Sequence, residues 1–156
     1  MTGERTLEQT VRWLADRAQI SDLLHSFARA LDTRDWQAYA DNYTDDGVLE
    51  LPPRSGAGRI VLHRADMPER VPKSLAAYSG TWHLSTNHQI EVDGDTARSR
   101  SYLLATHVRE SLPDHWQAGG WYDNTYRRTA KGWKFAHVRL TAVWLAGTQA
   151  PPITFD

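Results

Sequence analysis

The sequence contains no cysteine among its 156 residues. This absence excludes disulfide bonds, thiolate catalysis and metal sites held by cysteine, although it leaves the cellular compartment open. The chain also lacks a run of about 18 apolar residues, the length that predicts a membrane-spanning helix. Its polar N-terminus lacks the apolar core of a signal peptide. The sequence therefore predicts a cytoplasmic protein with no membrane partner.

A strong excess of charge of one sign is also missing, because the net charge at pH 7 is −1. Nucleic-acid-binding proteins commonly carry a basic surface, so no nucleic-acid partner is expected. A chain of this length can bury roughly 70% of its unfolded surface, and residues 1–156 are interpreted as a single domain. Tryptophan is abundant: the seven tryptophans suit a core and also a pocket for a bulky apolar ligand.

Helical periodicity dominates the first half of the sequence. Apolar residues recur in two stripes that are out of phase: Leu7, Val11, Leu14 and Ala18, then Ile20, Leu24, Phe27 and Leu31. They predict a helix that either faces two surfaces or breaks near Gln19. Thr33 or Asp35 is expected to cap a short second helix. Residues 44–47 are expected to form a turn before a short strand, and residues 63–80 a third, proline-interrupted helical region.

From Thr81 onward the pattern is one of strands. The turn "DGD" joins residues 81–92 to 96–110, and "TAKG" joins residues 116–128 to 133–145, which predicts two antiparallel hairpins. Helices first and a long antiparallel meander afterwards indicate an α+β fold, with one curved sheet and helices on one of its faces.

Two histidines are expected to meet at one end of this sheet. The two-residue period puts six residues of the second strand on one face: Ala97, Ser99, Ser101, Leu103, Ala105 and His107. Counting outward from "DGD" brings His83 within a residue or two of His107, whereas alternation puts His88 on the opposite face from His83. Asp32 lies at a helix C-terminus, where the macrodipole disfavours an acid. His83 is a candidate partner for Asp32 if the helix crosses the sheet there.

Other interpretations of these residues stay open. Asp32 can equally cap the helix that begins near Asp35, and His83 can be a structural histidine whose hydrogen bonds are satisfied. Asp32, His83 and His107 could also form a metal site of two histidines and one carboxylate. Nothing in their spacing favours that site, and no metal is predicted.

Three segments carry a family resemblance: "ALDTRDWQAYADNYTDDGVLE" (30–50), "TWHLSTNHQIEVDGDTARSRSYLLATH" (81–107) and "GWYDNTYRRTAKGWKFAHVRL" (120–140). In this order they resemble the SnoaL-like branch of the nuclear transport factor 2 superfamily over nearly the whole chain. The resemblance implies a cone, or cystatin-like α+β barrel. In that fold a strongly curved antiparallel sheet wraps against three helices, and a deep apolar pocket opens at one end.

Within that superfamily the sequence resembles scytalone dehydratase, hexachlorocyclohexane dehydrochlorinase and bile-acid dehydratase. The similarity implies that Asp32 orients His83 as a general base. It implies further that His107 is a second catalytic histidine and that Tyr122 lines the pocket on the next strand.

The chain departs from scytalone dehydratase at two positions where that enzyme has tyrosines. They fall at Leu31 and near Glu50, so scytalone itself is not the expected substrate. Tyr43 or Tyr122 is expected to substitute for the tyrosine that positions water. Trp82 and Asn87, on the same strand as His83, complete the predicted substrate-binding residues.

These residues predict a cofactor-independent lyase that carries out a dehydratase-type elimination. His83, held by Asp32, would remove a proton from a carbon beside a carbonyl or β to a leaving group. The expected substrate is a small hydrophobic polyketide, terpenoid, steroid or aromatic molecule. An isomerase or cyclase with the same pair is an alternative, and so is a non-catalytic binding or accessory module. The resemblance also implies a homo-oligomer, a dimer or trimer, paired through the outer face of the sheet near residues 98–104.

Overall fold

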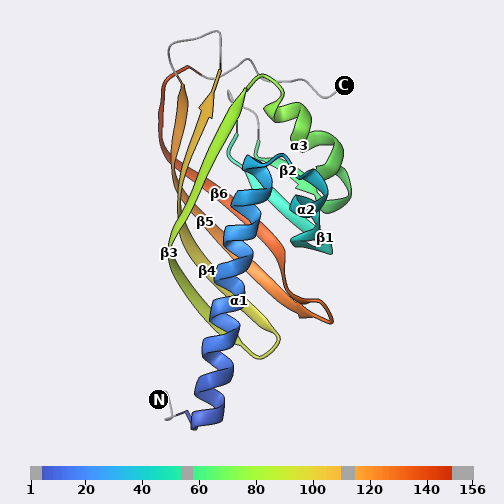
Figure 1. The fold of residues 1–156 in the computed structure, drawn as a ribbon, viewed down its shortest axis with the longest axis vertical. Coiled ribbons are helices and arrows are strands. Elements are labelled where there is room, and N and C mark those ends of the chain that lie inside the picture. The colour runs from blue at the N-terminus through green and yellow to red at the C-terminus, as the bar shows by residue number, and fades with distance from the viewer. Residues whose placement is uncertain (1–4, 54–57, 110–114, 149–156) are drawn as a thin grey trace.

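The computed structural model describes residues 5–53, 58–109 and 115–148, in which three α-helices pack against one six-stranded sheet (Figure 1). The helices are α1 (Leu7–Asp32), α2 (Trp36–Asp41) and α3 (Met67–Leu75), the last preceded by a 3-10 turn, Arg64–Asp66. The strands are β1 (Tyr43–Leu51), β2 (Ile60–His63), β3 (Gly80–Asp93), β4 (Thr96–Val108), β5 (Trp116–Thr129) and β6 (Gly132–Ala146).

The sheet has the strand order β2-β1-β6-β5-β4-β3. Strands β3 to β6 form the predicted antiparallel meander, and β1 lies parallel to β6. The sheet curves around α1, which lies across one of its faces, but β2 and β3 do not pair with each other, so the sheet does not close (Figure 1). This arrangement confirms the α+β fold with a curved sheet packed against helices.

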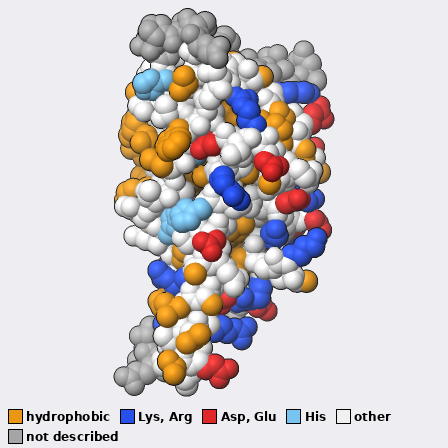
Figure 2. Space-filling view, in the orientation of Figure 1, with side chains coloured by type: hydrophobic (Ala, Val, Ile, Leu, Met, Phe, Trp, Pro, Cys, Tyr) orange, Lys and Arg blue, Asp and Glu red, His pale blue; other side chains and the backbone are white. Residues whose placement is uncertain are grey.

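The longest helix, α1, is continuous, so the break considered near Gln19 is absent. Of the two apolar stripes, the second lies in the core, where Ile20 and Leu24 are almost fully buried. The first stripe is exposed, and Leu7 at its start is 82% exposed. The reason is that the N-terminal end of α1 extends beyond the sheet, and Figure 2 shows apolar side chains along this end.

Side-chain caps fix where the first two helices begin. The Thr6 side chain accepts from the backbone N–H of Gln9, and the Gln9 side chain accepts from the backbone N–H of Thr6, which starts α1. Of the two predicted caps, Thr33 and Asp35, it is Asp35 that caps α2, because its carboxylate accepts from the backbone N–H of Ala38 at 3.0 Å.

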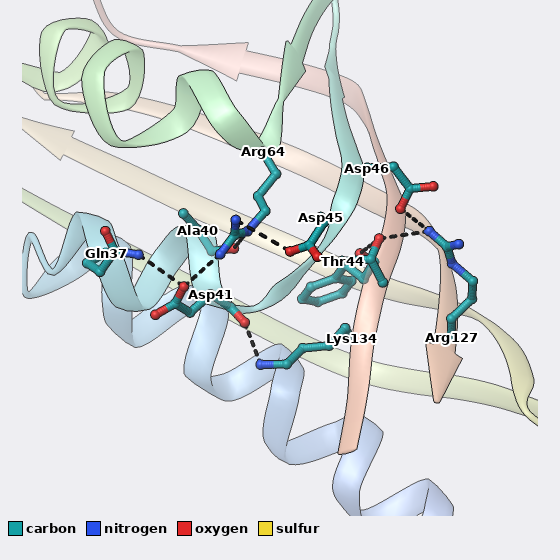
Figure 3. Close-up of polar contacts among 10 residues, drawn as sticks. Gln37, Ala40, Asp41, Thr44, Asp45, Asp46, Arg64, Arg127 and Lys134 are labelled. Atoms are coloured by element: carbon teal, nitrogen blue, oxygen red, sulfur yellow. Dashed lines mark hydrogen bonds and ion pairs between the residues drawn. The ribbon is translucent and has the colours of Figure 1, made fainter. Parts of the chain in front are cut away.

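Residues 44–47 do not form the predicted turn. Strand β1 runs through them with a register shift against β6, and it pairs on its other side with β2, a strand the sequence did not reveal. Two arginines from distant parts of the chain hold the polar side chains of this segment (Figure 3). Arg127 donates to Thr44 and Asp46, and Arg64 forms an ion pair with Asp45. Long-range pairing therefore overrode the local turn signal.

A bulge in β3 redirects one histidine. The register against β4 shifts between Thr86 and Gln89, and Asn87 takes a left-handed conformation with φ of 53°. His88 therefore turns toward α1, where its Nδ1 lies 2.8 Å from the Ser21 hydroxyl. The expectation that simple alternation puts His88 on the face opposite His83 is wrong, because the bulge adds a residue between them.

One buried charge ties α1 to the last hairpin. Asp16 is 5% exposed, and its carboxylate accepts two hydrogen bonds from Arg128, at 2.7 and 2.8 Å, and one from the Trp133 indole at 3.1 Å. The hydrogen bonds from Arg128 hold the pKa of Asp16 below its ordinary value, so the buried carboxylate stays ionised.

Candidate active site

Asp32 and His83 meet where the C-terminal end of α1 crosses β3. The His83 ring Nδ1 lies 2.7 Å from one oxygen of Asp32, and the Thr81 hydroxyl donates to that same oxygen at 3.0 Å. The other oxygen accepts from the backbone N–H of His83 at 2.9 Å. The carboxylate is therefore held by three donors from one strand.

The electrostatics of this contact keep Asp32 ionised. Burial raises the pKa of the Asp32 carboxyl, but hydrogen bonds from His83 and Thr81 outweigh it and leave the pKa below its ordinary value. An ionised carboxylate only accepts hydrogen bonds, so Nδ1 of His83 carries a proton. Nε2 of the neutral ring is then the nitrogen able to accept another proton.

His107 lies beside this pair, as the strand register predicted. Thr81 and His107 are direct partners across β3 and β4, and the rings of His83 and His107 are 5.4 Å apart and nearly perpendicular. His107 is only 6% exposed, and its ring packs against Trp116 with a centroid distance of 4.2 Å.

The two predicted tyrosines lie in the core, and both contact Phe27. Tyr122 packs edge-on against Phe27 at 5.6 Å, and burial raises its pKa, with further contributions from Tyr39 and from the charge of Asp32. Tyr43 is also buried, and its hydroxyl lies 3.3 Å from that of Tyr39. Burial likewise raises the pKa of Tyr43, so both tyrosines are neutral near pH 7.

Trp82 and Asn87 do not join the group. Trp82 is 63% exposed, because strand alternation directs it to the face opposite its neighbour His83. Asn87 is exposed at the bulge of β3, where its left-handed backbone makes the strand change register. The expectation that these two residues lie beside the bound substrate is therefore corrected.

Comparison with known proteins identifies the domain. A model of the SnoaL-like domain matches residues 12–139. This chain belongs to the SnoaL-like family. An uncharacterized protein of Mycobacterium tuberculosis is 27% identical over 128 residues, which cover 80% of this chain and 84% of that protein.

Solved structures agree with this family. A proposed aromatic ring hydroxylase of Novosphingobium aromaticivorans is 32% identical, with 86% of this chain and 94% of that chain covered and a TM-score of 0.76. A proposed scytalone dehydratase of the same organism is 21% identical, with coverages of 92% and 94% and a TM-score of 0.79. A type 2 hexachlorocyclohexane dehydrochlorinase is 22% identical, with coverages of 93% and 97% and a TM-score of 0.73. The likeness to these last two structures shows a shared fold.

Three further residues at this site were missed by the sequence interpretation. Thr81 donates to Asp32, and the rings of Tyr78 and Trp116 contact that of His107. The Tyr78 ring lies 5.0 Å from that of His107, and the Tyr78 and Trp116 rings are 6.5 Å apart and inclined by 24°. Trp116 could have been found, because the two-residue period puts it on the same face as Tyr122. Tyr78 lies between elements, where no periodicity applies.

Other kinds of site find no support within the described ranges. No three histidine, aspartate or glutamate side chains there are placed to hold a metal ion, so Asp32, His83 and His107 do not form the alternative metal site. None of the helices in the same ranges has the length and apolar character needed to cross a membrane.

Proposed function

We propose that this SnoaL-like protein is a cofactor-independent lyase that eliminates water or halide from a small hydrophobic molecule. The observation that carries the proposal is the contact between Asp32 and His83 Nδ1, which leaves Nε2 as a base. This is the arrangement by which a carboxylate fixes the tautomer of a catalytic histidine and stabilises the imidazolium that forms.

Each proton and electron pair of the elimination can be assigned to the substrate or to a residue of the site. His83 Nε2 takes a proton from the carbon beside a carbonyl or β to the leaving group, and the electrons of that C–H bond become the new double bond. The bond to the leaving group breaks, and its electron pair departs with the oxygen or halogen. His107 or the neutral phenol of Tyr122 donates a proton to a departing oxygen. A positioned base of this kind contributes about 10²–10⁴-fold in rate, so the substrate must carry an activated C–H bond.

The names of two structural neighbours support the reaction class. Scytalone dehydratase and hexachlorocyclohexane dehydrochlorinase are both names for eliminations, and both proteins share this fold. The substrate class proposed here is a polyketide, terpenoid, steroid or aromatic molecule, in keeping with the apolar and aromatic side chains around the pair.

The test is turnover by wild type and by variants of the pair. β-Hydroxy ketones and chlorinated cyclohexanes would be incubated with the protein, and loss of water or halide followed by mass spectrometry. Asp32→Asn and His83→Gln should each lower turnover at least about 100-fold, while Asp22→Asn, a matched change on the exposed side of the same helix, should leave it unchanged.

Each other outcome has a definite meaning. A product of unchanged mass would show an isomerase or cyclase rather than a lyase. Ligand binding with no turnover would show a binding module. Turnover that survives both variants would refute the role of the pair.

We also propose that the protein is a homo-oligomer that pairs through the outer face of its sheet. Trp82, Leu84 and Tyr102 are 63%, 39% and 51% exposed on β3 and β4. Beside them, β4, β5 and β6 line a hollow of about 420 Å³. Each of the three arginines that line it is paired with an acid: Arg98 with Glu91, Arg100 with Asp123 and Arg139 with Glu50. The face therefore carries no large excess of one charge that would keep two copies apart.

Sedimentation over a range of concentrations tests the interface. Tyr102→Lys would place a new charge among the exposed apolar residues of β3 and β4 and should produce monomers. Val11→Lys, at a similarly exposed position on α1, should not. A monomeric wild type would contradict the proposal.

A further inference from the structure

Trp116 presents a hydrogen-bond donor that the proposed elimination does not use. The residue begins β5 on the inner face of the sheet, and its ring lies 4.2 Å from that of His107. Its indole nitrogen, Nε1, is buried, and among the described residues it has no hydrogen-bond partner. A buried donor left unsatisfied is costly, and native proteins rarely keep one unless a ligand or water supplies the acceptor.

Aromatic rings surround this donor. The rings of Tyr78 and Trp116 are inclined by only 24°, and the His107 ring contacts both. Together these three rings make an aromatic wall next to His83, whose ring is 5.4 Å from that of His107. Aromatic surfaces of this kind favour planar, unsaturated ligands.

We propose that Trp116 is a specificity-determining residue that selects planar cyclic ketones by donating its indole N–H to the ketone oxygen. The substrate class rests on the proposed function, and the donor role explains how a ketone would be oriented in that site. When His83 removes a proton beside the carbonyl, negative charge develops on the ketone oxygen. An N–H donor in contact with this oxygen stabilises that charge.

Binding of two matched probes tests the donor without requiring turnover. 1-Tetralone is a planar bicyclic ketone, and tetralin is the same hydrocarbon skeleton without the oxygen. Each would be titrated into ¹⁵N-labelled protein while the indole N–H resonances are followed, with that of Trp116 identified by its disappearance in Trp116→Phe. 1-Tetralone should shift this resonance downfield, and tetralin should not.

The variant gives the quantitative outcome. Trp116→Phe keeps a ring in place and should weaken 1-tetralone binding by about 3- to 10-fold, the loss expected for one neutral hydrogen bond, while leaving tetralin affinity unchanged. Trp121→Phe, a matched change on the outer face of the same strand, should affect neither probe.

Three results would overturn the donor role: no saturable binding of 1-tetralone, binding that leaves the Trp116 resonance in place, or an equal loss of affinity for both probes in Trp116→Phe. The proposed function fails separately. If 1-tetralone binds as expected, also to Asp32→Asn, but no substrate is turned over, the lyase is refuted and the donor stands.

Discussion

Removing the Thr81 hydroxyl is a sharp test of how the Asp32 carboxylate is held. Thr81→Val takes away one of three hydrogen bonds while leaving the two donated by His83. A hydrogen bond to a charged group contributes about 1.5–3 kcal/mol. The Asp32 side chain is 22% exposed, so water replaces part of this contribution, and we expect a loss of about 1 kcal/mol in the free energy of unfolding at pH 7.

The stability that Thr81→Val removes should depend on pH in a definite direction. Because the pKa of Asp32 lies below its ordinary value, the hydrogen bonds to it stabilise the fold above the unfolded pKa of about 4. That stabilisation is lost as the pH falls through the folded pKa. Thr81→Val should therefore raise the pKa of Asp32, and its stability deficit should shrink in acid.

The assays are a ¹³C NMR titration of the Asp32 carboxyl carbon and urea unfolding at several pH values. Thr81→Ser retains the hydroxyl, so its Asp32 titration midpoint and its free energy of unfolding should match those of the wild type. An unchanged midpoint in Thr81→Val would show that the hydroxyl does not act on the carboxylate, and the reasoning about three donors would be refuted.

Two further predictions concern buried charges away from this site. Asp16→Ala leaves Arg128 without its buried carboxylate partner and should lower the free energy of unfolding in urea by about 3 kcal/mol. Asp95→Ala removes a 76% exposed partner of Arg128 and should lower it by less than about 1 kcal/mol. Equal losses in the two variants would contradict the burial argument. The pKa of His88 is lowered by burial and by the charge of His25. The unfolded chain binds that proton more readily, so stability should fall as the pH drops below about 6.5. In His88→Gln the free energy of unfolding should vary less between about pH 5 and 8 than it does in the wild type. An unaltered pH dependence in that variant would count against this assignment.

Strand alternation and register predicted the meeting of the two histidines from the sequence. The turn "DGD" fixes the pairing of β3 with β4, so the approach of His83 to His107 followed from counting residues outward from the turn. Tyr122, which the family resemblance placed in the pocket, is buried on the inner face of β5. Alternation could also have placed Trp116 there, since the two residues are separated by an even number of positions on one strand.

Sequence patterns predicted the wrong local structure where contacts between distant segments changed the course of a strand. The bulge around Asn87 turns His88 toward Ser21 of α1, and no local signal in β3 announces it. At residues 44–47, Arg127 and Arg64 hold side chains that by themselves favour a turn. In both places, contacts with residues distant in the sequence outweigh the conformation that the local sequence favours.

The sequence by itself determined the α+β fold, the strands of the meander, and the presence of an acid and two histidines at positions able to meet. Local periodicity and turn chemistry suffice for these features, because they depend on neighbours in the chain. Only the tertiary structure decided that α1 crosses β3 where Asp32 reaches His83 and Thr81, that Tyr78 and Trp116 flank His107, and that the first apolar stripe of α1 remains exposed. These features depend on the angle at which a helix crosses a curved sheet and on where that sheet ends, which are set by the packing of the whole core.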